Sequence, residues 1–105
     1  MALIEVTSTE QFEELLRRSE KAAVELTAAW SGPSQLIHPV FERLSEQYHD
    51  IGFVSVDVDR VAPVAQAYGI RAMPTFIFFK HGEKSDDLMG TSKAGLEDKV
   101  KTLAS

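Results

Sequence analysis

The sequence predicts a single α/β domain, residues 1–105, in which a central mixed β-sheet has helices on both faces. Segments with strand-like and helix-like hydrophobic spacing alternate along the chain. Two strand-like segments joined by a short turn follow near the C-terminus, and no repeat, linker or low-complexity segment interrupts the series. The predicted order is therefore βαβαβα followed by ββα. The first three strands should be parallel because crossover connections are right-handed.

The first quarter of the chain predicts a strand, a helix and a second strand. Leu3–Val6 is a short apolar stretch. Ser8 precedes Gln11 by three residues, the spacing at which an N-cap and the third helical residue satisfy each other's backbone N–H groups. The helix that follows has an apolar face formed by Phe12, Leu15 and Leu16. Ala23–Ala28 has the composition of a buried strand, although it contains Glu25.

The helix that begins at Pro33 has the strongest pattern in the sequence. A proline inside a helix removes one hydrogen bond and bends the axis. Because the hydrophobic spacing continues beyond Pro39, we expect a kink there and not an end. The apolar residues at three- and four-residue spacing are Leu36, Ile37, Val40, Phe41, Leu44 and Tyr48.

A central strand and a short helix are predicted next. Ile51–Val58 is rich in valine, isoleucine and phenylalanine, which favour strands. Asp59 or Arg60 should open the helix, and Gly69 has the position of the glycine that follows a helix C-terminus. The apolar face of this helix is formed by Val61, Val64, Ala65 and Tyr68.

A β-hairpin and a final helix complete the predicted fold. Thr75–Phe79 is a strand, His81–Lys84 has turn composition, and a weaker strand ends near Met89. Ser92 is placed to cap the last helix. The inward stripe of that helix is formed by Leu96, Val100 and Leu103.

Composition excludes several classes of function. Sixteen acidic and 11 basic side chains give a formal charge of −5, and Lys and Arg form no cluster, which argues against nucleic-acid binding. No apolar run approaches the ~20 residues that cross a bilayer. The N-terminal segment has no basic region followed by a long apolar one, so we expect a cytoplasmic protein without a membrane partner. The sequence has no cysteine, which excludes disulfides, thiolate metal sites and thiol catalysis.

The segment between the second strand and the long helix carries the most informative motif. Residues 29–34 read Ala-Trp-Ser-Gly-Pro-Ser. In open α/β sheets the binding site lies beyond the carboxyl ends of the parallel strands, so we expect it at residues 30–34, 57–60 and 71–74. The motif resembles the Trp-Cys-Gly-Pro-Cys site of the thioredoxin family, with Ser31 and Ser34 at the positions of the two cysteines.

The resemblance covers essentially the whole chain. Pro39 matches the helix-kinking proline of the family, residues 68–75 match the loop that contains a cis-proline, here Pro74, and residues 79–82 match the hairpin. Gly90 matches a glycine beside the substrate groove. The resemblance implies the thioredoxin fold and a general protein-disulfide reductase without a bound cofactor. Its partners would be disulfide-containing proteins and an NADPH-dependent flavoprotein thioredoxin reductase, and the protein would be a monomer.

The resemblance also implies roles for individual positions. Position 31 would be the attacking nucleophile, position 34 the resolving thiol and Glu25 the proton acceptor. A serine hydroxyl is not ionised near neutral pH and cannot form a reversible S–S bond, so we predict a redox-inactive chain that binds only non-covalently. The substrate groove would be lined by Trp30, Gly32, Pro33, Val58, Ala72, Met73, Pro74 and Gly90.

Three positions depart from the family pattern. Glu25 stands where aspartate is usual, Ser55 where a partner lysine is often found, and Leu26 where an aromatic residue is usual. We interpret the chain as a divergent active thioredoxin in which both cysteines were deliberately replaced, because the rest of the motif is retained. The alternative is a natural redox-inactive thioredoxin-fold protein that serves as a binding or chaperone module.

Other polar residues have simpler interpretations. The three histidines are scattered without metal-ligand spacing and are expected on the surface. Asp57 and Asp59 are also expected to be exposed to solvent, and the alternative is an acidic rim that faces a partner beside the groove. Ser34 and His38 share a helix face, but no nucleophile elbow or orienting acid supports a hydrolase. If Glu25 is buried without a cation such as Lys21, its replacement by glutamine should raise the melting temperature.

Overall fold

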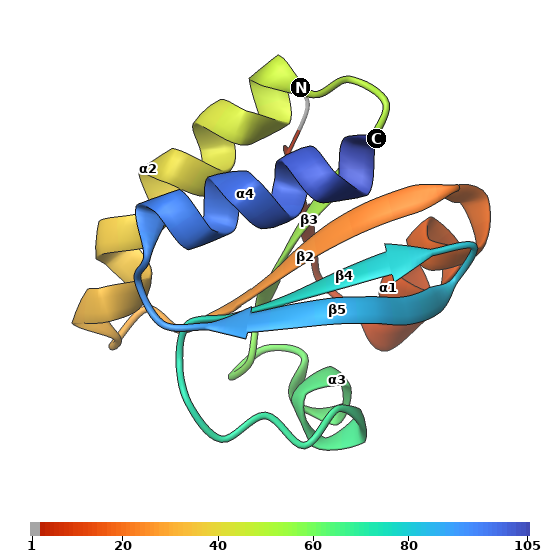
Figure 1. Cartoon of the computed structure of the whole chain (residues 1–105). Coiled ribbons are helices and arrows are strands. Elements are labelled where there is room, and N and C mark those ends of the chain that lie inside the picture. The colour runs from red at the N-terminus through yellow and green to blue at the C-terminus, as the bar shows by residue number, and fades with distance from the viewer. Residues whose placement is uncertain (1–2) are drawn as a thin grey trace.

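The structure, a computed structural model, describes residues 3–105; Met1 and Ala2, the start of the predicted domain, lie outside the described residues. Five strands form one mixed sheet in the order β1-β3-β2-β4-β5 (Figure 1). The strands are β1 (Leu3–Val6), β2 (Lys21–Thr27), β3 (Gly52–Asp57), β4 (Thr75–Lys80) and β5 (Glu83–Met89). The helices are α1 (Thr9–Arg18), α2 (Gly32–Gln47), α3 (Ala62–Ala67) and α4 (Lys93–Ala104).

The strand directions confirm the predicted topology. β1, β3 and β2 are parallel, whereas β4 is antiparallel to β2, and β5 is antiparallel to β4 at the edge of the sheet. Leu26 near the end of β2 pairs with Val56 near the end of β3 and with Thr75 at the start of β4. The loops that leave β2 and β3 and the loop that enters β4 therefore lie at the same edge of the sheet.

Helices cover both faces of the sheet, as predicted. α2 and α4 lie on one face, and α1 and α3 lie on the other (Figure 1). The sheet therefore separates two apolar cores. The core beneath α2 and α4 contains Phe41, whose ring centroid lies 5.2 Å from that of Phe53 and 5.4 Å from that of Phe76. Burial of these large rings fixes α2 on the sheet and so fixes the loop that precedes it.

Serine side chains begin two helices as the sequence predicts. The Ser8 Oγ accepts a hydrogen bond from the Gln11 backbone N–H at 3.1 Å, and the Ser92 Oγ accepts one from the Gly95 N–H at 3.0 Å. The predicted reciprocal bond differs in one detail. The Gln11 side chain accepts from the N–H of Thr7 and not from that of Ser8.

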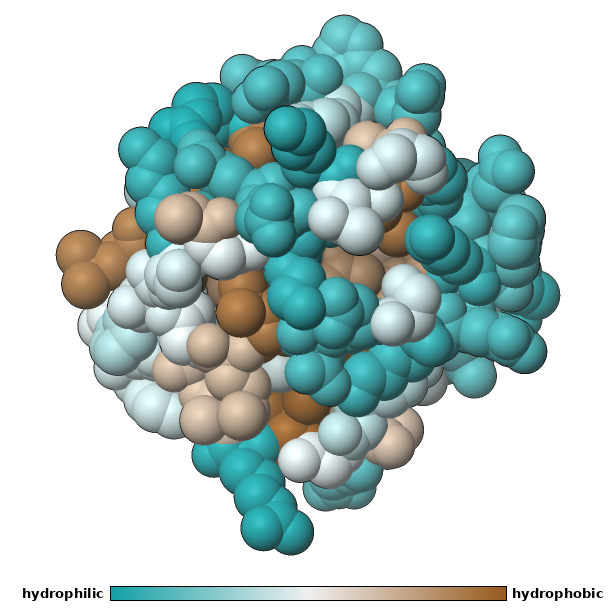
Figure 2. All heavy atoms as spheres, viewed as in Figure 1, coloured by the Kyte–Doolittle hydropathy of each residue, from teal (hydrophilic) through white to brown (hydrophobic). Residues whose placement is uncertain are grey.

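The interior of α2 confirms one prediction and corrects another. The helix runs through Pro39 without ending. Leu36, however, is 76% exposed and does not join the apolar face. At 100° per residue the buried line passes through Ile37, Phe41 and Leu44, and Leu36 lies to one side of it. Figure 2 shows an apolar side chain protruding on the side of the molecule where α2 begins.

The short helix α3 begins later than predicted. Its N-cap is Val61, without a side-chain cap, and not Asp59 or Arg60. The Asp57 carbonyl accepts hydrogen bonds from the N–H groups of Arg60 and Val61, so these residues form a turn before the helix. Gly69 follows the helix with a φ of 64°, in agreement with the predicted role of a glycine there.

Candidate functional site

Both serines of the motif lie at the N-terminus of α2. Ser31 is the N-cap, and its Oγ accepts a hydrogen bond from the N–H of Ser34 at 3.2 Å. Ser31 is 5% exposed and Ser34 is fully buried. Within residues 3–105 the Ser34 Oγ has no hydrogen-bond partner. Position 31 is thus held beside the partial positive charge of a helix N-terminus, where a negative charge is stabilised.

Trp30 connects the motif to the loop after β3. Its side chain is 71% exposed, and its indole Nε1 donates a hydrogen bond to the Asp59 Oδ2 at 2.9 Å. The Asp57 Oδ1 accepts from the N–H of Asp59 at 2.9 Å and orients this residue. Asp59 is exposed as predicted, but its carboxylate also holds the tryptophan, so the two loops are joined.

Replacement of Asp59 by alanine is expected to release the Trp30 side chain. An exposed hydrogen bond contributes about 1 kcal/mol, so the free energy of unfolding should fall by no more than that. Trp30 is the one tryptophan in the sequence, which makes its fluorescence anisotropy decay a direct measure of ring mobility. We expect faster local motion than in the parent and in the control Asp98→Ala. Equal decays in all three proteins would contradict this role of Asp59.

The loop before β4 is the third part of the site. The Met73–Pro74 peptide bond is cis, which confirms the expectation from the resemblance. The Pro74 carbonyl accepts a hydrogen bond from the Gly90 N–H at 3.1 Å, and the Ala72 carbonyl accepts one from the Thr75 hydroxyl at 2.7 Å. The predicted groove residues 72–74 and Gly90 are therefore neighbours.

The other predicted groove residues lie at the same edge of the sheet. Gly32 and Pro33 are exposed in the first turn of α2. Val58 is half-buried, and its N–H donates to the Thr27 carbonyl. Beyond the predicted set, large apolar side chains are also exposed at Leu36 and, next to Gly90, at Met89.

Glu25 is fully buried in β2, and its carboxylate is paired. The Glu25 Oε1 accepts hydrogen bonds from the His38 Nδ1 at 2.8 Å and from the Ser55 Oγ at 3.0 Å. The condition on which the predicted gain in melting temperature rests, a buried Glu25 without a partner, is therefore not met, and the partner is His38 and not Lys21. The Lys21 Nζ donates instead to the carbonyl groups of Ala104 and Ser105, because β2 begins at the opposite end of the sheet from the site.

His38 is the functional candidate that the sequence analysis missed. It was expected on the surface, but it faces the sheet one helical turn after Ser34, and its side chain is 28% exposed. The hydrogen bond to Glu25 raises the pKa of His38, and the nearby charges of Glu25, Glu42 and Glu5 act in the same direction, against the effect of burial. The spacing of four residues from Ser34 was the available signal.

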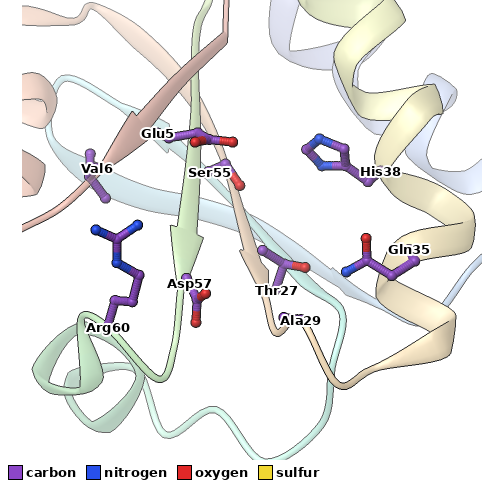
Figure 3. Close-up of a pocket in the computed structure, with 9 residues that line it drawn as sticks. All are labelled: Glu5, Val6, Thr27, Ala29, Gln35, His38, Ser55, Asp57 and Arg60. Carbon is purple, nitrogen blue, oxygen red and sulfur yellow. The ribbon is translucent and has the colours of Figure 1, made fainter.

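A cavity of about 190 Å³ lies between α2 and the carboxyl ends of β1, β3 and β2. Figure 3 shows His38 and Gln35 on the helix side and Glu5 and Arg60 on the opposite side. The complete lining consists of Glu5, Val6, Thr27, Ala29, Gln35, His38, Ser55, Asp57 and Arg60. The His38 imidazole thus borders a polar space as well as the buried carboxylate.

Some other kinds of site find no support in these contacts. Ser34 is buried without a hydrogen bond to His38, whose Nδ1 is bonded to Glu25, so the pair lacks the geometry of an activated nucleophile. Among residues 3–105, no three His, Cys, Asp or Glu side chains lie close enough to hold a metal ion. Over the same range, no helix has the length and hydrophobicity needed to span a membrane.

The fold and the site together define a protein of the thioredoxin-fold class. Its features are a mixed five-stranded sheet covered on both faces, a Trp-x-Gly-Pro-x segment at a helix N-terminus, and a cis-proline loop at the same edge of the sheet. The thioredoxin family model matches residues 3–102. The chain belongs to the thioredoxin family.

Individual relatives agree with this assignment. An H-type thioredoxin of Picea mariana is 44% identical over 94 residues, which are 90% of this chain and 75% of that protein. The solved structure of Malassezia sympodialis thioredoxin superposes with a TM-score of 0.93 at 35% identity, over 98% of this chain and 91% of that one. A cysteine-to-serine mutant of Entamoeba histolytica thioredoxin superposes with a TM-score of 0.90 at 35% identity, over 96% and 99% of the two chains.

Proposed function

We propose that the cysteine-containing form of this chain is a general protein-disulfide reductase, and that the chain with Ser31 and Ser34 binds the same partners without reacting. The observation that carries the proposal is the placement of both serines at the N-terminus of α2, where the family has its cysteines. Its partners would be disulfide-containing proteins and an NADPH-dependent thioredoxin reductase. We further propose that it acts as a monomer in the cytoplasm, without a bound cofactor.

The proposed reaction uses the two motif positions in turn. A thiolate at position 31, stabilised by the helix N-terminus, attacks one sulfur of a substrate disulfide, and the other sulfur leaves as a thiolate. The thiol at position 34 gives its proton to Glu25 and attacks the sulfur at position 31. The bond to the substrate breaks, the second substrate sulfur leaves reduced, and a disulfide joins positions 31 and 34. Two electrons have passed from the protein to the substrate.

The groove that would hold the substrate lies around the motif. The Trp30 side chain is exposed, and its hydrogen bond to Asp59 holds it between two loops. Both features support a role of this ring in binding the substrate. The cis-proline loop would present backbone groups to an extended substrate segment. We propose that the groove is lined by Trp30, Gly32, Pro33, Val58, Ala72, Met73, Pro74 and Gly90.

Restoration of both cysteines tests the proposal. The unaltered chain should reduce a disulfide-containing protein no faster than buffer, in the presence of NADPH and a thioredoxin reductase. The Ser31→Cys/Ser34→Cys variant should consume NADPH at a rate proportional to its concentration. A folded double variant without activity would contradict the reductase proposal and favour a binding or chaperone module. The genomic codons at both positions would show whether the serines are natural.

A further inference from the structure

We propose that His38 is the positioning residue through which the buried carboxyl group of Glu25 exchanges protons with solvent. The inference rests on the proposed function, since it concerns the proton that Glu25 receives from position 34 in the cysteine-containing form. In this proposal the side chain of His38, on α2, acts on Glu25 and does not contact the substrate.

The first observation is the isolation of Glu25. The residue is fully buried, and only two side chains donate hydrogen bonds to its Oε1, those of His38 and Ser55. Ser55 is itself 5% exposed and does not titrate near neutral pH. His38 is 28% exposed and does titrate there. Of the two side chains that contact the Glu25 carboxyl group, only His38 is both titratable near neutral pH and partly exposed to solvent.

The second observation is the polar cavity beside His38. The imidazole lines it together with the hydroxyl-bearing residues Thr27 and Ser55. Glu5, Gln35 and Arg60, which also line the cavity, are exposed, so the space opens to solvent (Figure 3). Nδ1 is bonded to Glu25, which leaves Nε2 as the ring nitrogen that can exchange a proton with this space.

The carboxylates around His38 stabilise the protonated form of its imidazole. Carboxylates face it from three elements: Glu25 on β2, Glu5 on β1 and Glu42 on α2 itself, and all three raise the pKa of its imidazole. Asp57 at the end of β3 adds a further carboxylate to the cavity wall, and Arg60 adds its one basic side chain. Partial burial acts in the opposite direction and lowers the pKa of the imidazole.

The proton balance closes over the Glu25–His38 pair. At rest the pair shares one proton between the carboxylate and the imidazole. The pair gains a second proton when the thiol at position 34 is deprotonated, and it loses one when the His38 Nε2 releases a proton to the cavity. The pair returns to its resting state when the disulfide between positions 31 and 34 is reduced, because Glu25 then gives its proton back to the sulfur at position 34 and the His38 Nε2 takes one from the cavity. Ser55 stands where the family often has lysine, and its hydroxyl donates to Glu25 but does not titrate near neutral pH. His38 is therefore the neighbour of Glu25 that can release the proton.

The test uses the Ser31→Cys/Ser34→Cys variant, alone and combined with His38→Gln. A glutamine amide can still donate to Glu25 but cannot titrate. We expect kcat at pH 7 to fall by about tenfold with KM unchanged, and the dependence of kcat on pH between 6 and 8.5 to flatten. The matched control is Ser55→Ala, which removes the other hydrogen bond to the same oxygen and should keep the pH profile.

A second measurement uses the unaltered chain. In an NMR titration, the imidazole of His38 should lose its proton at a higher pH in the unaltered chain than in the Glu25→Gln variant, because the Glu25 carboxylate raises the pKa of His38. If the double-cysteine variant is inactive, the proposed function fails. If that variant is active while His38→Gln keeps its rate and pH profile, or if Glu25→Gln leaves the titration of His38 unchanged, the role of His38 is overturned.

Discussion

A chain in which Ser31 alone is changed to cysteine is expected to capture disulfide-containing partners covalently and to hold them. Position 31 caps α2, and a thiol there has its pKa lowered from about 8.5 by the helix N-terminus and by the N–H of residue 34. The thiolate should attack a partner disulfide. Without a second thiol at position 34, nothing in the chain can release the partner, because the sequence has no other cysteine.

Mass spectrometry of the mixture after removal of small thiols measures this capture. The Ser31→Cys variant should accumulate an adduct that approaches one partner per chain and that only an added thiol dissolves. The matched control is Ser34→Cys, whose position is fully buried whereas Ser31 retains 5% exposure, so it should form almost no adduct. Equal capture by the two variants, or spontaneous release from Ser31→Cys, would show that the nucleophile and resolving roles are assigned wrongly.

The arrangement of elements could be predicted because each one has a local cause. The serine caps at Ser8 and Ser92 and the glycine after α3 are properties of a few consecutive residues. Parallel strands follow from the alternation of strand and helix patterns and from the handedness of crossovers. Errors were confined to the ends of helices and strands and to helix faces. Leu36 is apolar, but helix geometry places it outside the buried face that contains Phe41. Apolar character alone does not show which face of a helix a residue lies on.

The partners within the site could not be predicted in the same way. Glu25 and His38 are 13 residues apart and lie on different elements, so their contact exists only once α2 packs on the sheet. The same holds for Trp30 and Asp59, which are 29 residues apart. Local sequence could indicate that a carboxylate in an apolar strand needs a partner. It could not select His38 over Lys21, because that choice depends on which end of β2 each side chain reaches.

The Glu25–His38 pair should also govern how stability depends on pH. The Glu25 carboxylate raises the pKa of His38 above its unfolded value of about 6.5, so the folded chain binds more protons than the unfolded chain between these two pKa values. Stability from this pair is fully present below pH 6.5 and is lost as the pH rises through the folded pKa. The free energy of unfolding should therefore decline across that window.

Replacement of His38 by leucine is expected to lower the free energy of unfolding, and to lower it more at pH 6 than at pH 9. Removing one partner of a buried ion pair costs about 3 kcal/mol, because Glu25 would keep only the hydrogen bond from Ser55. Urea unfolding at pH 6 should show this loss, and the same comparison at pH 9 should show a smaller one. The control Glu25→Leu/His38→Leu replaces the whole pair by apolar side chains and should recover most of the stability. A loss that is equal at both pH values, or a double variant as unstable as His38→Leu, would mean that His38 stabilises the fold through packing and not through its charge.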